Sequence, residues 1–299
     1  MRFPAAVVAA LVLAALPAPA QAAGCVWTAS GLPTHRNLEN DRVDAMSPDG
    51  TITVGDAVYP VTRDLKGILW LGSTPVDMAD PNFGPGVHNW PWDVNNAGVV
   101  VGYTYDESTA MTRPYRYHVQ DGSYEWLQPS VGFAAANYVN ERGDVAGWIS
   151  DNGGDHVVLW PAGSVQPQVI GTGQPAGLDE AGRVVTTNGE IWSPDGTTVR
   201  IKDRRAHPER YAEGHVIGAA SDGKTVEWNL AGKVTRTFPG AGSATAVNSS
   251  GVFATKHGLH WAIWTDGAPQ DVDGYIAGIT DSGVAYGNND QGAVVYRCV

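Results

Sequence analysis

Short apolar runs recur along the chain, each preceded by a small polar turn that contains glycine. The clearest pair is VNNAGVVVGY at Val94–Tyr103 and VNERGDVAGW at Val139–Trp148. Apolar runs bounded by Asn, Asp and Gly are typical of β-hairpins, because the turn often needs the positive φ that glycine adopts without strain. Each such segment therefore predicts two antiparallel strands joined by a tight turn.

The hairpin pattern occurs seven times. Its turn glycines lie about 39 residues apart on average, at Gly50, Gly98, Gly143, Gly182, Gly214, Gly251 and Gly283. Another apolar strand follows each hairpin and carries an aromatic residue, at Tyr59, Tyr117, Trp160, Trp192, Trp228, Trp264 and Tyr296. Most units then have a second turn and a further strand. Each unit is thus predicted to hold four short strands, and no segment has the periodicity of an amphipathic helix.

Seven four-stranded units of this length predict an all-β fold, a seven-bladed β-propeller. Two β-sandwich domains would not explain one unit in seven copies. Six or eight blades are the remaining alternatives, because the unit at Tyr211 matches the pattern least. The last unit stops after its third strand, and an open ring would leave unpaired edges. We therefore expect the N-terminal strand at residues 25–29 to complete the last blade.

The N-terminal segment of the chain predicts export. Residues 1–23 read as a signal peptide, since Arg2 is followed by a short apolar run and then small residues. That run is too short to span a bilayer, so no membrane insertion is expected. A lipoprotein is the alternative, although the leucine expected three positions before Cys25 is absent. Residues 24–299 are then a single propeller domain, secreted to the extracellular space.

The two cysteines, Cys25 and Cys298, lie near the two ends of the mature chain. In an exported protein an even number of cysteines predicts a disulfide, and two cysteines allow one intramolecular pairing. Such a bond would fasten the ring where its first and last strands meet. Two unrelated free thiols are the alternative.

The charge of the chain limits its partners. The formal net charge is −12, and 17% of the residues are charged. A surface this acidic does not suit phosphate groups, so nucleic acid is not expected as a partner. The basic cluster KDRRAHPER at Lys202–Arg210 is interpreted as a solvated loop rather than an anion site.

The repeat resembles a known pattern. VNNAGVVVGY followed by PYRYHVQDGSYEWLQ is similar to the HAF-type repeat of secreted bacterial proteins, in which I/V-N-x-x-G-x-V-V-G-x precedes an aromatic-bearing strand. GFAAANYVNERGDVAGW with HVVLWPAGSVQPQVIG is the best copy, and the resemblance spans roughly Asp41 to Cys298. The His-Ala-Phe triplet is not intact; HVVLW at His156 comes nearest. The resemblance implies an extracellular propeller-like array and no established activity.

Candidate binding residues follow from the expected loops. In a propeller, the loops between strands two and three and those between blades gather on one face, where a rigid scaffold presents its ligand-binding groups. Exposed aromatic rings there stack on sugars or hold a partner protein. Packing between blades is the alternative role. The predicted ligand-binding residues are Trp90, Trp92, Tyr103, Tyr105, Trp148, His156 and Tyr275.

Catalytic and metal signatures are weak. No G-x-S-x-G elbow and no zinc-type histidine spacing occurs, so no catalytic residue and no metal ligand is predicted. A site shared by loop histidines of several blades is an alternative, with candidates His88, His156, His257 and His260. The acidic loops SDNGGD, DVDG and DSGVAYGNND would suit calcium, but none has the twelve-residue calcium-loop spacing. We therefore expect no cofactor, with calcium as the alternative.

These observations favour a secreted, non-catalytic binding module. Its expected partner is an extracellular glycan, or a secreted or cell-surface protein, recognised by loops on one face. Two alternatives remain open: a propeller hydrolase or lyase with its site at the channel mouth, and a structural subunit of a larger secreted assembly.

Overall fold

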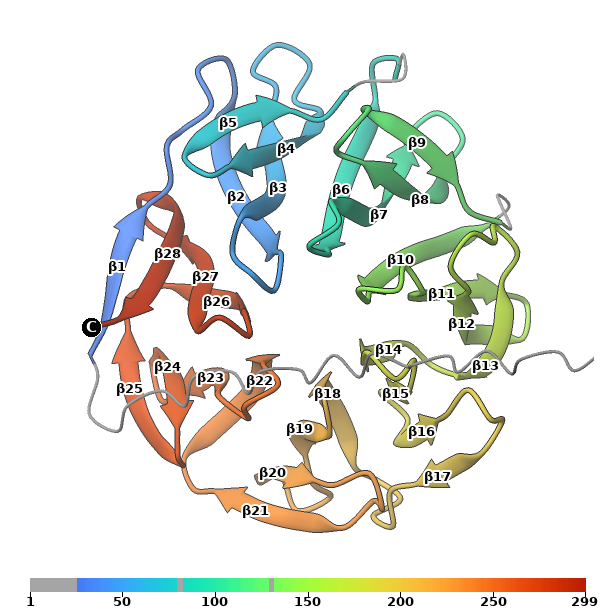
Figure 1. Ribbon diagram of the computed structural model, residues 1–299, viewed down its shortest axis with the longest axis vertical. Helices are drawn as coiled ribbons and strands as arrows, with labels where there is room; N and C mark the ends of the chain where they lie inside the picture. The colour runs from blue at the N-terminus through green and yellow to red at the C-terminus, as the bar shows by residue number, and fades with distance from the viewer. Residues whose placement is uncertain (1–25, 80–82, 129–131) are drawn as a thin grey trace, which may run out of the picture.

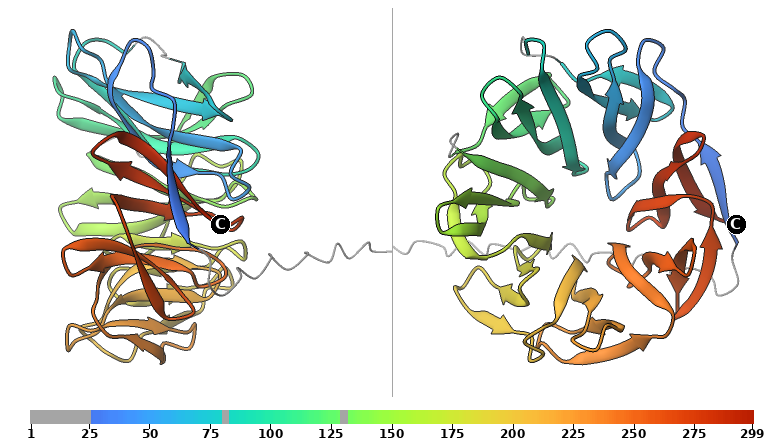
Figure 2. Two further views of the ribbon diagram at one scale, coloured as in Figure 1. Left: turned by 90° about the vertical axis from the view of Figure 1, so that its left-hand side faces the viewer. Right: turned by 180° about the vertical axis from the view of Figure 1, so that it is seen from behind.

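The computed structural model describes residues 26–79, 83–128 and 132–299, so the predicted signal peptide and Cys25 lie outside the described residues. Across these ranges, 28 strands form seven four-stranded antiparallel sheets. The sheets are arranged as blades around a common centre (Figure 1), where propellers have a central channel, and the ring seen edge-on is a thick disc (Figure 2). The predicted seven-bladed propeller is confirmed. Within the described ranges, no helix has the length and apolarity needed to cross a membrane.

In six blades the strands run outward from the channel in chain order. These blades are β2 (Glu39–Met46), β3 (Ile52–Val58), β4 (Leu65–Leu71) and β5 (Thr74–Asp77); β6 (Val87–Val94), β7 (Val99–Asp106), β8 (Met111–His118) and β9 (Ser123–Trp126); β10 (Phe133–Val139), β11 (Val145–Asp151), β12 (Gly154–Trp160) and β13 (Gln168–Thr172); β14 (Pro175–Leu178), β15 (Val184–Thr186), β16 (Glu190–Trp192) and β17 (Thr198–Arg200); β18 (His207–Ala212), β19 (His215–Ala219), β20 (Thr225–Trp228) and β21 (Val234–Phe238); and β22 (Ala241–Val247), β23 (Phe253–His257), β24 (His260–Thr265) and β25 (Ala268–Val272).

The seventh blade closes the ring with strands from both ends of the chain. It contains β26 (Tyr275–Ile279), β27 (Val284–Asn289) and β28 (Gly292–Cys298), with β1 (Trp27–Gly31) as the outermost strand. Closure by the N-terminal strand is confirmed, although this strand begins two residues later than predicted. Trp27 lies opposite Cys298 in the register of the two strands. Because Cys25 is outside the described residues, the disulfide stays a prediction.

The N-x-x-G part of the repeat forms the turn between the two innermost strands of a blade. In blade 2, Gly98 has a φ of 75° and donates its N–H to the Asn95 carbonyl, at 3.1 Å. The Asn95 side chain accepts the Val99 N–H at 2.9 Å and donates to the Asn140 carbonyl of the next blade at 3.0 Å. All seven predicted turn glycines have positive φ. The asparagine of the repeat therefore both shapes its own turn and joins neighbouring blades.

Each innermost strand contains a β-bulge, which leaves one residue of the strand unpaired. The bulge residues are Asp44, Trp92, Asn137, Ala176, Glu209, Thr245 and Ala277. The bulge brings the innermost strand close to its neighbour, and this explains the second glycine of the repeat. A Cβ on Gly102 would lie 2.2 Å from the Trp90 carbonyl oxygen.

The hydrophobic core fills the spaces between blades. Trp160 and Trp228, two of the aromatic markers, lie in third strands and are fully buried. The marker assigned to blade 1, Tyr59, was wrong: this residue follows β3 and is 38% exposed. Trp70 on β4 is the equivalent buried aromatic residue. The connection between β3 and β4 spans residues 59–64, which displaces the marker along the chain.

Candidate functional site in the channel wall of blades 1 and 2

The residue pairs whose inner-strand member lies two positions before the bulge form one layer around the channel. We call them the pre-bulge pairs. In blades 1, 2, 3 and 7 they are Arg42–Asp56, Trp90–Tyr103, Ala135–Trp148 and Tyr275–Asn288. Four of the predicted ligand-binding residues therefore belong to pre-bulge pairs: Trp90, Tyr103, Trp148 and Tyr275. Sequence reasoning missed the charged pair of blade 1, Arg42 and Asp56.

Blade 2 contributes a set of aromatic rings that we call the blade 2 array: His88, Trp90, Trp92, Tyr103 and Tyr105. The Trp90 ring centroid lies 5.2 Å from that of Tyr103 and 5.5 Å from that of His88, with which it is stacked. His88 also stacks on Tyr105, at 6.3 Å. Trp92 is 46% exposed and its side chain is hydrogen-bonded to that of Tyr103. The array thus combines an accessible indole with rings that support it.

Hydrogen bonds fix the His88 ring at one end of the array. The Leu65 N–H donates to Nδ1 of His88 at 3.0 Å, so Nε2 carries the proton. Nε2 lies 3.0 Å from Oε1 of Glu107, to which it donates. A ring held from both nitrogens gives Trp90 and Tyr105 a rigid surface to stack on.

Blade 1 places two carboxylates beside this array. Asp56 is 1% exposed, and neither of its oxygens has a hydrogen-bond donor; the same holds for Oδ2 of Asp44. The side chains of Asp44 and Asp56 interact directly, and two buried carboxyl groups in contact favour a proton on one of them. Nη2 of Arg42 lies 4.0 Å from Oδ1 of Asp44. We call Asp44 and Asp56 the carboxylate pair.

Burial and mutual repulsion hold a proton on the carboxylate pair. Burial, followed by the charge of Asp56, raises the pKa of Asp44 well above its usual range, and the Arg42 charge opposes this shift. Burial also raises the pKa of Asp56, against the effects of Arg42 and of the contact with Asp44. Burial raises the pKa of the Tyr103 phenol; the hydrogen bond from Trp92 opposes this shift, while the charges of both carboxylates add to it. Tyr103 is therefore the link between the array and the pair.

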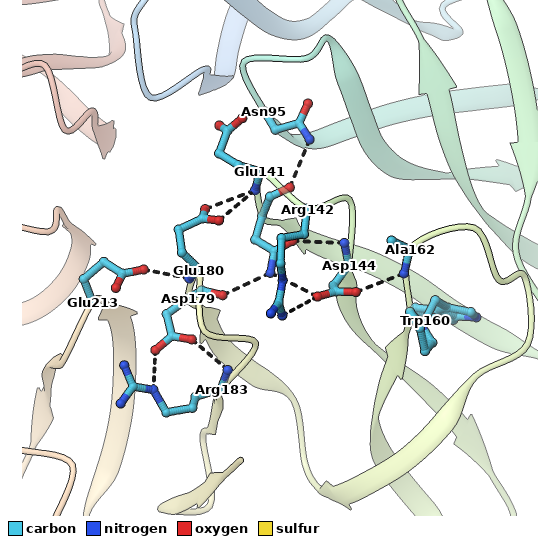
Figure 3. A network of polar contacts seen from close by, with 12 residues as sticks. Asn95, Glu141, Arg142, Asp144, Trp160, Ala162, Asp179, Glu180, Arg183 and Glu213 are labelled. Atoms are coloured by element: carbon cyan, nitrogen blue, oxygen red, sulfur yellow. Dashed lines mark hydrogen bonds and ion pairs between the residues drawn. The ribbon is translucent and has the colours of Figure 1, made fainter. Parts of the chain in front are cut away.

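The inner turns form an acidic ring at one mouth of the channel. The Glu141 N–H donates to both carboxylate oxygens of Glu180, each at 3.1 Å, and the Glu180 N–H donates to Glu213 at 2.7 Å (Figure 3). Partial burial raises the pKa of Glu180, and the charges of Glu141 and Glu213 add to the shift. With the exposed turn residues Asp49 and Asp281, these three glutamates form what we call the acidic turn ring.

Asp93 lies between the inner strands of blades 2 and 3. Its carboxylate accepts the N–H groups of Val139, at 2.8 Å, and Val94, at 2.9 Å. Burial raises the pKa of Asp93 to about 7; the two backbone N–H groups oppose the shift, and the charges of Glu141 and Glu180 add to it. This carboxyl group therefore titrates near neutral pH.

The other predicted ligand-binding residues do not join the array. Trp148 is half-buried on β11, and His156 on β12 lies 3.1 Å from Oδ1 of Asp151. Tyr275 of blade 7 packs edge-on against Trp261 of blade 6, with ring centroids 5.0 Å apart. The prediction that such residues lie in loops was wrong for four of them, which lie in strands: Tyr103, Tyr105, Trp148 and His156. Strands two and three extend further than expected and leave only short turns between them.

The histidines that could have shared a site are distributed among blades. His88, His156 and His257 each pair with a carboxylate of their own blade, Glu107, Asp151 and Asp271 respectively. Over residues 26–79, 83–128 and 132–299, no three His, Cys, Asp or Glu side chains are grouped in a way that could hold a metal ion.

A cavity of about 380 Å³ lies away from the array, beside the outer strands of blade 1. Tyr59, Met78, Phe83 and Asn89 are among its lining residues. Asn89 is engaged by two tyrosines of blade 2: it accepts from Tyr115 at 2.7 Å and donates to Tyr124 at 3.0 Å. The channel wall differs from this cavity, because buried carboxylates without partners and an accessible indole lie side by side there.

Comparisons with known proteins support the fold. No family model and no curated protein sequence matches the chain. An oligogalacturonate lyase in complex with manganese has a TM-score of 0.58 at 10% identity, covering 93% of this chain and 94% of its own. For a puromycin hydrolase the TM-score is 0.57 at 14% identity, covering 88% and 54%. For the AfRom2 CNH domain it is 0.54 at 12% identity, covering 91% and 99%.

These similarities show the propeller fold and nothing beyond it, because the identities are low and one fold hosts many functions. The chain spans 54% of the puromycin hydrolase and 42% of a dipeptidyl peptidase 4 from Porphyromonas gingivalis, which it matches with a TM-score of 0.47. Lyases and hydrolases are thus among the structural neighbours, as is a CNH domain.

Proposed function

We propose that the protein is an exported glycan-binding propeller whose ligand stacks on the blade 2 array. The observation that carries this proposal is that the Trp92 side chain is both exposed and held in place. This bulge residue is 46% exposed in the channel wall, while its side chain is held by Tyr103, which packs on Trp90. An indole that is accessible yet held in place offers a sugar ring a preformed apolar face with hydrogen-bonding groups around it.

A glycan array followed by calorimetry tests the proposal. The wild-type protein should bind at least one glycan, and Trp92→Ala should weaken that binding by about tenfold or more, as expected for the loss of a central aromatic anchor. Phe133→Ala is the matched control, because Phe133 is a similarly exposed aromatic residue (49%) on the innermost strand of blade 3. Equal affinity of wild type and Trp92→Ala for every glycan bound would refute the proposal.

Cleavage of the bound glycan is the second candidate. The carboxylate pair favours it, because a carboxyl group with a raised pKa beside a bound sugar can donate or accept a proton. Mass spectrometry of the ligand after prolonged incubation decides between the two. New, shorter chains that are absent with Asp44→Asn would support catalysis, and unchanged chain lengths would support binding alone.

A further inference from the structure

We propose that the ligand is a cationic glycan built of glucosamine, whose ammonium group binds at the Asp44–Asp56 pair while a sugar ring stacks on Trp92. This inference rests on the proposed function and adds the chemical class of the ligand. It follows from three independent features of the described residues: unpartnered carboxylates, adjacent aromatic rings and a negatively charged channel.

The carboxylate pair lacks hydrogen-bond donors from other residues, and an ammonium group can supply them. Three of its four oxygens, both of Asp56 and Oδ2 of Asp44, are buried and accept no hydrogen bond from any other residue, so the shared proton is the one donor available to them. Buried polar atoms are rarely left unpaired, so this gap calls for a partner. An ammonium group has three N–H donors and a positive charge, and its hydrogen bonds to carboxylates are stronger than neutral ones. It would take the place of the proton that the pair otherwise shares.

Asp44 is the more accessible member of the pair. Its side chain is 19% exposed and that of Arg42 is 57% exposed, whereas Asp56 and the unpartnered Oδ2 of Asp44 are buried. The carboxylate oxygen nearest to Arg42 is 4.0 Å from the guanidinium, which is longer than a hydrogen bond. Arg42 therefore neutralises the pair only in part and does not fill its hydrogen-bonding sites.

The aromatic rings lie next to the pair. Asp44 and Trp92 are the bulge residues of β2 and β6, the innermost strands of neighbouring blades, and these two strands pack on each other. Tyr103 is hydrogen-bonded to Trp92, and its pKa is raised by burial, with the charges of Asp44 and Asp56 adding to the shift. A sugar on Trp92 would therefore hold its amino group near the pair, with an aromatic face that also attracts cations.

The surrounding charge favours a cation over a neutral or acidic sugar. The acidic turn ring lies in the inner turns of blades 1, 3, 4, 5 and 7, at one mouth of the channel, and the whole chain has a net charge of −12. Such a field attracts cationic ligands and repels uronates. Besides Arg42, the titratable groups whose charges interact with Asp44 include Asp56, Tyr103 and Tyr115, and none of these three adds positive charge.

Calorimetry with two matched oligosaccharides tests the inference. A glucosamine oligomer and an N-acetylglucosamine oligomer of equal length present the same rings and differ in charge. The wild-type protein should bind the glucosamine oligomer about tenfold tighter or more, as expected for a charge-assisted hydrogen bond. Binding should release protons, seen as a dependence of the measured heat on the buffer, because the bound ammonium favours the fully ionised pair.

Substitution of Asp44 separates charge recognition from stacking. Asp44→Asn should weaken glucosamine binding by about tenfold and leave the acetylated oligomer unaffected. Asp266→Asn removes an equal charge from an exposed turn of blade 6, where positive φ already suits asparagine, and should change neither affinity. A thermal unfolding scan confirms that each variant is folded. If Asp44→Asn does not fold, the comparison of the two oligomers in the wild type decides.

Each outcome has a distinct meaning. Equal affinity for the two oligomers overturns the cationic ligand, yet the proposed function survives if Trp92→Ala still abolishes glycan binding. A failure to bind either oligomer also overturns the inference. If Trp92→Ala leaves the binding of every glycan unchanged, the proposed function fails as well.

Discussion

Replacing Asp56 by asparagine should stabilise the protein at alkaline pH. In the wild type, both oxygens of this buried residue lack donors, and its contact with Asp44 depends on a shared proton. The amide of Asp56→Asn can donate to the Asp44 carboxylate without any proton. One hydrogen bond to a charged group contributes about 1.5–3 kcal/mol net. At about 2 °C per kcal/mol for a domain of this size, the expected rise in Tm is about 3–6 °C.

The pH dependence gives the sign of the effect. Because the folded-state pKa values of Asp44 and Asp56 are raised, the wild-type pair contributes its full stability at acidic pH and loses it as pH rises through those pKa values. The gain from Asp56→Asn should therefore be large at about pH 8 and small at about pH 4, which is close to the usual pKa of an aspartate.

Differential scanning calorimetry at the two pH values measures this difference. Asp266→Asn, in an exposed turn of blade 6, controls for the loss of one negative charge. A variant that is less stable than the wild type by the same amount at both pH values would refute the shared proton. It would also remove the physical basis for an ammonium site at this pair.

Three further outcomes are expected. The wild type should lose stability as pH rises from about 6 to 8 because the pKa of Asp93 is about 7 in the folded protein, and Asp93→Asn should flatten this dependence in thermal scans; an unchanged slope contradicts the assignment. Trp70→Ala should lower the free energy of unfolding by about 3–5 kcal/mol, and Tyr59→Ala by no more than about 0.5 kcal/mol, in urea titrations; equal losses would mean that Tyr59 is the core aromatic residue. A non-reducing peptide map of the mature protein should recover Cys25 linked to Cys298, whereas two alkylated thiols would contradict the disulfide.

The fold was predictable because each blade encodes its own turn. Asn95, Gly98 and Gly102 act over a few residues, through a turn and one close backbone contact, so their spacing alone indicates a hairpin. Closure of the ring was predictable from a missing strand, but its register was not. The sequence near Trp27 contains no turn that fixes which residue faces Cys298.

The site was only partly predictable, because strand register decides it. Trp90 and Trp92 stand out in any sequence, whereas Asp44 and Asp56 resemble ordinary turn residues. A signal did exist: Asp56 follows the second glycine of its repeat, as Tyr103 does in blade 2, at a position that faces the neighbouring strand. The contact between Asp44 and Asp56 also depends on a bulge that no single-residue property indicates.

Hydrogen–deuterium exchange with and without the tightest-binding glycan tests the central claim most directly, which is that the ligand occupies the channel wall of blades 1 and 2. The account predicts added protection in peptides covering β2 and β3 and in those covering β6 and β7, with blades 4 to 6 unchanged. Protection confined to blades 4 to 6, or to the outer strands of the ring, would contradict it.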